Sequence, residues 1–144
     1  MEQSSDSEEL RFLAKSGEEA LAREDIARVA AAAGFEPERI EEIRTAVNEA
    51  CLNALEHSDS RSFTVWYSVH RTALIVEVRN SGQPFRMPES TPDLAAKMEG
   101  EQPPRGWGLY LMRRLCNRLS MSHKGGINVI HMEFDVHPAH SHRT

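Results

Sequence analysis

The stretch 46–57 constrains the fold and chemistry of this chain more than any other part of the sequence. It places an acid, Glu49, and an amide, Asn53, four residues apart among small apolar residues. Residues at positions i and i+4 share one face of an α-helix, so both side chains project from the same side of a predicted helix. A carboxylate beside an amide oxygen can take a proton from a hydroxyl group and can hold a hard cation such as Mg²⁺. A plain polar strip on a helix surface is the alternative, and the pair alone does not decide.

Length and charge limit the classes of protein to consider. A chain of 144 residues is long enough for one hydrophobic core, and its net charge of -5 argues against a nucleic-acid-binding surface. No apolar run approaches the roughly 20 residues that span a bilayer. We therefore expect a soluble, cytoplasmic protein with no nucleic acid or membrane partner. Cys51 and Cys116 do not form a Cys-x-x-Cys pair and are expected to be small buried residues.

Apolar periodicity predicts a short edge strand at residues 10–14 and then two helices. Ser16 and Glu19 have the spacing of a capping box, which predicts a helix that runs to about residue 33 and ends at Gly34. The inward residues of this helix are expected to be Leu21, Ile26, Val29 and Ala30. The second helix is expected to start near Pro37 and to continue through the acid-amide pair to residues 59–60.

After residue 61 the apolar period changes from that of a helix to two, which is typical of strands. The remaining elements are expected as follows: antiparallel strands at 62–70 and 73–78, a long loop at 86–105 with a short helix at 92–98, a helix at 108–119, and strands at 119–123 and 128–136 around Gly125-Gly126.

This order of elements indicates an α+β fold. We expect a two-layer sandwich in which a mostly antiparallel sheet carries helices on one face. One domain is expected over residues 9–136, with flexible segments at 1–8 and 137–144.

Two glycine motifs follow the acid-amide helix. A predicted strand ends in Asn80-x-Gly82, and Gly106-x-Gly108 precedes a predicted helix. Glycines at a helix N-terminus let backbone amides approach a phosphate group, which the helix dipole also favours. A tight loop-to-helix corner would need the same glycines. Arg105, just before them, can clamp a phosphate with its guanidinium group or lie in solvent.

Taken in order, these three segments resemble the N, G1 and G2 boxes of the GHKL (Bergerat-fold) ATP-binding superfamily. Within that superfamily the chain looks most like the anti-sigma-factor serine kinases of the SpoIIAB and RsbW type, over nearly its whole length. The resemblance implies the Bergerat arrangement of sheet and helices, with ATP and Mg²⁺ as cofactors. It also implies a homodimer.

The resemblance implies a role for each matching residue. Glu49 is implied as the general base and Asn53 as the Mg²⁺ ligand. The implied nucleotide-binding residues are Asn80, Gly82, Arg105, Gly106, Gly108 and Leu109. Leu109 is also expected, from its helical spacing, to be a core residue.

Asn80 departs from the family, which carries an aspartate there to accept a hydrogen bond from the adenine amino group. An amide can rotate and donate to a guanine carbonyl instead, so we expect weaker ATP binding and poorer discrimination between bases. Asn128 stands where relatives tend to carry a threonine near the adenine. It is either a polar contact of the base or a turn residue.

Three functional classes follow from the resemblance. The first is an ATP-dependent protein-serine kinase that phosphorylates a small antagonist (anti-anti-sigma) protein and sequesters a sigma factor. The second is a nucleotide-binding interaction module with weak or no kinase activity, for which Asn80 is the warning. The third, the ATP-binding domain of a histidine kinase or larger GHKL enzyme, is disfavoured because no dimerisation helix or phosphoacceptor segment precedes residue 9.

Overall fold

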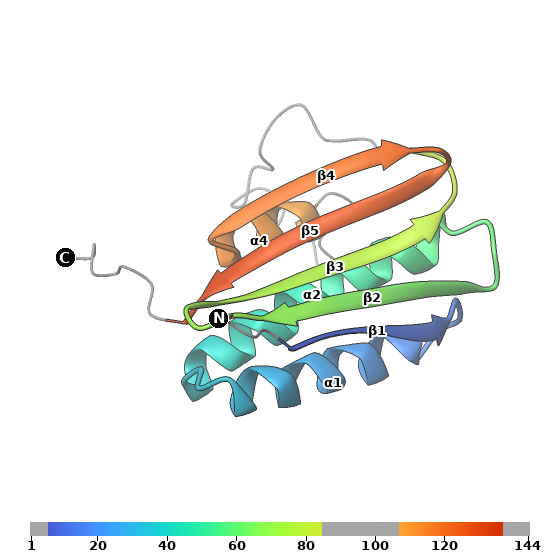
Figure 1. Ribbon diagram of the computed structural model, residues 1–144. Coiled ribbons are helices and arrows are strands. Elements are labelled where there is room, and N and C mark those ends of the chain that lie inside the picture. Colours follow the sequence, from blue (N-terminus) through green and yellow to red (C-terminus); the bar gives the residue numbers. More distant parts are fainter. Residues whose placement is uncertain (1–5, 85–106, 137–144) are drawn as a thin grey trace, which may run out of the picture.

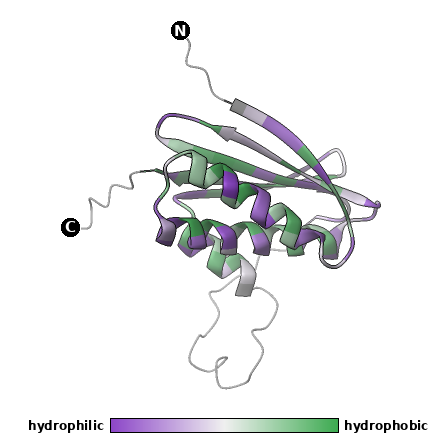
Figure 2. Cartoon of the chain, turned by 90° about the horizontal axis from the view of Figure 1, so that it is seen from below, coloured by the Kyte–Doolittle hydropathy of each residue, from purple (hydrophilic) through white to green (hydrophobic). Residues whose placement is uncertain are grey.

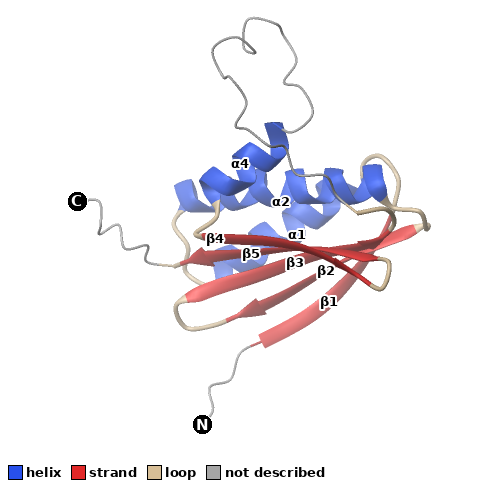
Figure 3. Cartoon of the chain, turned by 90° about the horizontal axis from the view of Figure 1, so that it is seen from above, coloured by secondary structure: helices blue, strands red, loops and turns tan. Residues whose placement is uncertain are grey.

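The computed structural model describes residues 6–84 and 107–136, and these form a two-layer α+β sandwich (Figure 1). One layer is a five-stranded antiparallel sheet of order β1-β2-β3-β5-β4, and the described helices all cover the same face of it (Figure 3). This confirms the expected fold class. The elements are β1 (Asp6–Leu13), α1 (Glu18–Ala32), α2 (Pro37–His57), β2 (Ser62–Val69), β3 (Ala73–Ser81), α4 (Trp107–Leu115), β4 (Arg118–Lys124) and β5 (Ile127–Asp135).

The first strand is longer than expected. β1 begins at Asp6, so residues 6–8, which were expected in a flexible segment, belong to the sheet. The polar sequence Asp-Ser-Glu of these residues hid the strand, but an edge strand tolerates polar and charged residues. Glu8 also has a partner, since the hydroxyl of Tyr67 on β2 donates to its carboxylate at 2.8 Å. The expected helix at 92–98 and the tail 137–144 lie outside the described residues.

The start of α1 differs from the expected capping box. Gly17, not Ser16, is the N-cap residue, with a left-handed φ of 100°. Glu19 still reaches back, because its carboxylate accepts a hydrogen bond from the Gly17 backbone N–H at 2.9 Å. At the other end Gly34 takes a φ of 99°, which confirms it as the residue that terminates the helix.

The buried face of α1 consists mainly of alanines. Ile26 and Ala30 are buried as expected, whereas Leu21 is 55% exposed. The prediction that Leu21 faces inward is wrong. Leucine is large and apolar, but α1 turns mainly its small alanines toward the neighbouring elements, and the small residues allow close packing. The buried residues of α1 are Ala22, Ile26, Ala27 and Ala30.

The core lies between the sheet and the helices. Along β3 and β5, buried residues alternate with half-buried ones, as the period of two predicts. Hydrophobic and hydrophilic bands therefore alternate along strands and helices alike (Figure 2). The expected hairpin at Gly125-Gly126 is confirmed, since both residues have the positive φ of a tight two-residue turn, 58° and 78°.

Arg39 on α2 explains why α4 stops at Leu115 rather than at residue 119. Its guanidinium group donates to the Leu115 carbonyl oxygen at 2.7 Å and to the Asn117 side-chain oxygen at 2.5 Å. It also lies 5.4 Å from the centre of the Phe134 ring. Asn117 in turn accepts a hydrogen bond from the Asp135 backbone at 2.8 Å, so the chain leaves α4 and enters the sheet at a fixed point.

We expect Arg39→Met to lower the free energy of unfolding by about 1–3 kcal/mol, because a half-buried helix end loses a charged donor. Urea denaturation at neutral pH measures the change. Arg28→Met on α1 is the control, since Arg28 is 71% exposed and pairs only with Asp25 among the described residues. The control should change stability by less than about 0.5 kcal/mol. Equal losses in both variants would mean that Arg39 does not hold the end of α4.

Candidate functional site

A row of polar side chains lies along one face of α2. Glu49, Asn53 and His57 are spaced four residues apart and all are half-buried. The row is about 12 Å long, since an α-helix rises about 1.5 Å per residue. The adjoining face of α2 packs into the core through Ile43, Ala46, Val47, Ala50, Cys51 and Ala54. The expected acid-amide helix is therefore present, with both side chains on one face.

At one end of the row, Glu49 lies against Gly108 in the first turn of α4. A Cβ atom on residue 108 would overlap with the Glu49 carboxylate oxygen Oε1, so the carboxylate fills space that only glycine leaves open. The start of α4 is also the positive end of its helix dipole. Two segments far apart in the sequence thus meet at the candidate general base.

Burial raises the pKa of the Glu49 carboxyl group above its ordinary value. A general base works best when its pKa lies near the working pH, so the shift is in the direction that proton transfer requires. The Glu49 carboxylate is therefore partly shielded from water, lies beside the N-terminus of α4 and has a raised pKa. A polar residue that only faces solvent on a helix surface would have none of these three properties.

At the other end of the row, Gly82 packs against the last turn of α2. Its φ of 153° suits glycine, and a Cβ atom there would collide with the backbone oxygen of His57. The backbone N–H of Asp59 donates to the Ser81 carbonyl oxygen at 2.9 Å. Gly82 therefore holds the end of β3, and Asn80 with it, beside the C-terminus of α2.

Asn80 is 4% exposed and only one half of its amide is satisfied. Its Nδ2 donates to the Ser81 carbonyl oxygen at 3.0 Å, whereas its Oδ1 is buried and has no hydrogen-bond partner in the described part of the chain. Turning this amide over so that it donates to a guanine carbonyl, as the sequence analysis expects, would break the bond to Ser81. The unpaired acceptor fits the amino group of an adenine base.

Asn128 lies directly opposite Asn80 in the ladder between β3 and β5. It is fully buried, and it is a strand residue rather than a turn residue. Its Nδ2 donates to the Gln83 carbonyl oxygen at 2.7 Å, and its Oδ1 accepts from His123 Nδ1 at 3.0 Å. Asn128 therefore fixes the segment that follows Asn80, a role that the sequence analysis missed.

The family resemblance also implies Arg105, Gly106 and Leu109 as nucleotide-binding residues. Arg105 and Gly106 lie outside the described residues. Leu109 is 6% exposed and belongs to the hydrophobic core, so any contact of this residue with a nucleotide would come from its backbone.

In the described part of the chain, no group of three or more His, Cys, Asp or Glu side chains could hold a metal ion. Mg²⁺ commonly binds to one or two protein oxygens together with substrate phosphates, so the amide oxygen of Asn53 fits such a site without a preformed cluster.

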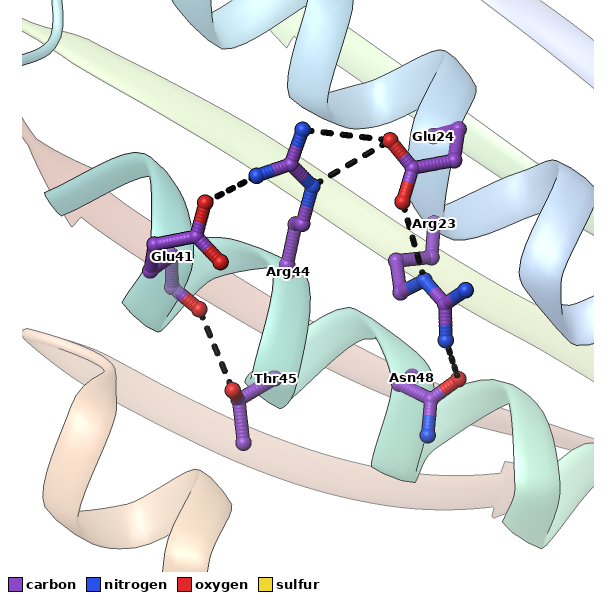
Figure 4. Close-up of a pocket in the computed structure, with 6 residues that line it drawn as sticks. All are labelled: Arg23, Glu24, Glu41, Arg44, Thr45 and Asn48. Carbon is purple, nitrogen blue, oxygen red and sulfur yellow. Dashed lines mark hydrogen bonds and ion pairs between the residues drawn. The ribbon is translucent and has the colours of Figure 1, made fainter. Parts of the chain in front are cut away.

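A polar groove of about 460 Å³ runs between α1 and α2 (Figure 4). Asn48 belongs to it and accepts a hydrogen bond from Arg23 at 3.0 Å. Arg44 pairs there with both Glu24 and Glu41, and its hydrogen bond to Glu24 lowers the pKa of that carboxyl group. Because these charges compensate one another, the groove carries no candidate site.

The family of the chain follows from comparison with known proteins. A family model described as a histidine kinase-like ATPase domain matches residues 12–134. The chain belongs to this family, which confirms the GHKL resemblance.

Curated relatives support the anti-sigma kinase type. The chain is 28% identical over 129 residues to serine-protein kinase RsbW of Listeria monocytogenes (strain HCC23), covering 84% of this chain and 82% of the relative. It is also 28% identical over 130 residues to serine-protein kinase RsbW of Bacillus cereus (strain AH187), covering 85% and 81%. The chain is therefore similar to ATP-binding regulatory kinases.

The fold has a counterpart among solved structures. The crystal structure of the RsbU and RsbW domains of a Mycobacterium tuberculosis protein aligns with a TM-score of 0.66 at 16% identity. The alignment covers 90% of this chain and 32% of that chain. None of the helices described here is long and apolar enough to cross a membrane.

We expect alanine at the two glycines to have different effects. Gly82→Ala should destabilise the fold by about 1–3 kcal/mol, because Cβ meets rigid backbone at a φ that favours glycine. Gly108→Ala should leave stability within about 1 kcal/mol, since alanine favours a helix and the obstacle is a flexible side chain. It should nevertheless displace the Glu49 carboxylate. Urea denaturation of both variants measures the difference, and a Gly108→Ala variant as unstable as Gly82→Ala would contradict it.

Proposed function

We propose that this chain is an ATP-dependent protein-serine kinase that phosphorylates a small antagonist protein and binds a sigma factor. The observation that carries the proposal is the setting of Glu49: a half-buried carboxylate of raised pKa, against Gly108 at the start of α4 and one turn from Asn53. The similarity to RsbW serine-protein kinases supports the choice of a serine hydroxyl as the phosphate acceptor.

The other end of the same helix face supports a nucleotide as the phosphate donor. The buried, unpaired Oδ1 of Asn80 is an acceptor without a donor, and an adenine amino group would satisfy it. The row of about 12 Å along α2 then separates the base from the reacting phosphate. Arg105 and Gly106 join the proposal through the family resemblance, as phosphate-binding residues.

In the proposed reaction, the substrate serine oxygen attacks the γ-phosphorus of ATP. Glu49 takes the proton of that hydroxyl group, the bond between the γ-phosphorus and the bridging oxygen breaks, and ADP leaves with the bond electrons. Phosphoserine is formed, and Glu49 later releases its proton to water. Mg²⁺ neutralises phosphate charge when it is bound, and Asn53 is the residue that would hold it.

A nucleotide-binding interaction module without kinase activity is the second candidate. The observation in its favour is Asn80, which stands where the family carries an aspartate. Both candidates bind ATP, so the deciding experiment is phosphate transfer from γ-labelled ATP to a candidate antagonist protein. Labelled serine in that protein supports the kinase, whereas binding of ATP and of the antagonist without transfer supports the module.

The assembly and location belong to the same proposal. By similarity to anti-sigma kinases, we propose a homodimer that meets its sigma factor and antagonist in the cytoplasm, where ATP is available.

We expect Glu49→Gln to abolish phosphate transfer while ATP affinity stays within a fewfold of wild type, because the carboxylate acts on the attacking hydroxyl group. Calorimetric titration and the transfer assay measure the two effects. Glu38→Gln, the same change at an exposed position of α2, is the matched control and should leave both unchanged. Transfer at the wild-type rate in Glu49→Gln would exclude Glu49 as the base.

The same variant tests the cost of burying Glu49. Its pKa is higher in the folded protein than the unfolded value of about 4.3, so the folded state loses stability as the pH rises through that interval. The penalty is therefore present at neutral pH, and Glu49→Gln should be at least as stable as wild type at pH 7. A clear loss of stability at pH 7 would mean that the carboxylate stabilises the fold.

We expect Asn53→Ala to weaken binding of ATP with Mg²⁺ more than binding of ADP without Mg²⁺, since the amide oxygen would be a metal ligand. Titrations with and without EDTA separate the two. Asn48→Ala, on the same helix but bonded to Arg23, should weaken neither selectively. Equal weakening of both nucleotides by Asn53→Ala would assign Asn53 a structural role.

A further inference from the structure

The helix α4 rests on the protein through a narrow contact. It packs mainly against α2 and only slightly against β4 (Figure 3). Among its described side chains, Leu109 and Met112 are buried, and their spacing of three residues puts them on the same side of the helix. A helix of nine residues that rests on one strip of side chains can tilt, so its position depends on what holds its two ends.

Two side chains of α2 contact the two ends of α4. Glu49 lies against Gly108 in the first turn, and Arg39 donates to the Leu115 carbonyl oxygen in the last turn at 2.7 Å. The two helices are therefore antiparallel where they meet. Arg39 and Glu49 are about 15 Å apart along α2, and Gly108 and Leu115 are about 10 Å apart along α4. The length of the arginine side chain spans the difference.

The charges of these two side chains match the dipole of α4. The N-terminal end of a helix is positive and here meets a carboxylate, whereas the C-terminal end is negative and here meets a guanidinium group. Arg39 is 15% exposed, and further contacts with the Asn117 side chain at 2.5 Å and with the Phe134 ring at 5.4 Å hold it in place. Because a short helix moves as a rigid rod, the grip on its last turn also determines how closely its first turn lies on Glu49.

We propose that Arg39 is a positioning residue for the general base: by holding the last turn of α4 on α2, it keeps the first turn of α4 against the Glu49 carboxylate. This inference rests on the proposed function, because it concerns the residue that takes the proton of the substrate serine. Burial raises the pKa of Glu49, and the first turn of α4 is part of what covers this carboxylate. When α4 tilts away, water reaches the carboxylate and its pKa falls toward the ordinary value.

The first test is an NMR titration of the Glu49 carboxyl carbon in the full chain without nucleotide, with the signal assigned by its loss in Glu49→Gln. Arg39→Met keeps the unbranched apolar stem and removes the charge, so we expect the pKa of Glu49 to fall most of the way to its ordinary value. Arg39→Lys keeps a charged donor for the Leu115 carbonyl oxygen and should restore much of the wild-type pKa. Ile26→Val removes one methylene group from the core on α1 and is the control for a general loss of stability, so it should leave the pKa unchanged.

Thermal melts verify that each variant is folded at the temperature of the titration. If Arg39→Met is unfolded there, Arg39→Gln takes its place with the same expectation. A Glu49 pKa that stays at the wild-type value in the folded variant overturns the inference. An equal fall of the pKa in Ile26→Val overturns it as well.

The transfer assay tests the same role in the reaction. At saturating ATP we expect Arg39→Met to transfer phosphate roughly tenfold more slowly, because the base is weaker and less well placed, while ATP affinity stays within about threefold. The acid limb of the pH profile should move to lower pH with the pKa of Glu49. A slower rate with an unmoved pH profile indicates a merely structural role and overturns the inference. A wild-type chain that transfers no phosphate overturns the proposed function instead, and the titration without nucleotide still decides the role of Arg39.

Discussion

Close packing of α2 is the constraint on which the rest of the structure depends. Its buried side is mostly alanine, valine and cysteine, and small residues let a helix lie near the sheet and near α4. The approach is so close that a Cβ atom at Gly108 would meet the Glu49 carboxylate, and one at Gly82 would meet the His57 carbonyl group. Gly82 and Gly108 are therefore explained by contacts with α2 as well as by any ligand. These contacts within the protein hold the two ends of the polar row in place.

The same packing places polar groups where they cost stability. Glu49 is partly removed from water, which raises its pKa, and Asn80 Oδ1 is buried without a partner. A fold tolerates such groups only where other contacts compensate. Here the compensation lies away from the site, in the apolar alternation of β3 and β5 and in Arg39, which ties the end of α4 to α2. A half-buried carboxylate on α2 and a buried, unpaired acceptor on β3 cost stability, and such costs are typical of a functional site.

The sequence predicted the fold class because the switch of apolar period from helical to two is local and strong. It also predicted the face shared by Glu49 and Asn53, since helical spacing alone determines it. The sequence failed to predict features that depend on which other elements pack against a residue. Leu21 is exposed because α1 turns its alanines inward, and β1 begins at Asp6 because an edge strand tolerates charges. The contact between Glu49 and Gly108 joins residues 59 positions apart, and no local pattern contains it.

Asn80 and Asn128 show how far the sequence alone can predict the candidate site. Each interrupts an apolar alternation, Val76 and Val78 before Asn80, and Ile130 and Met132 after Asn128, so the sequence marks both as inward-facing polar residues. That they oppose each other depends on the register of β3 and β5, which a long connection joins and no hairpin turn fixes. Which amide is satisfied depends in turn on Ser81, Gln83 and His123. The asparagine side chain is in general a weaker hydrogen-bond acceptor than the aspartate carboxylate. At this position, however, three neighbouring hydrogen bonds determine which polar atom stays unpaired. What the end of the ladder presents to a ligand therefore depends on these contacts, and a single substitution in a motif does not reveal it.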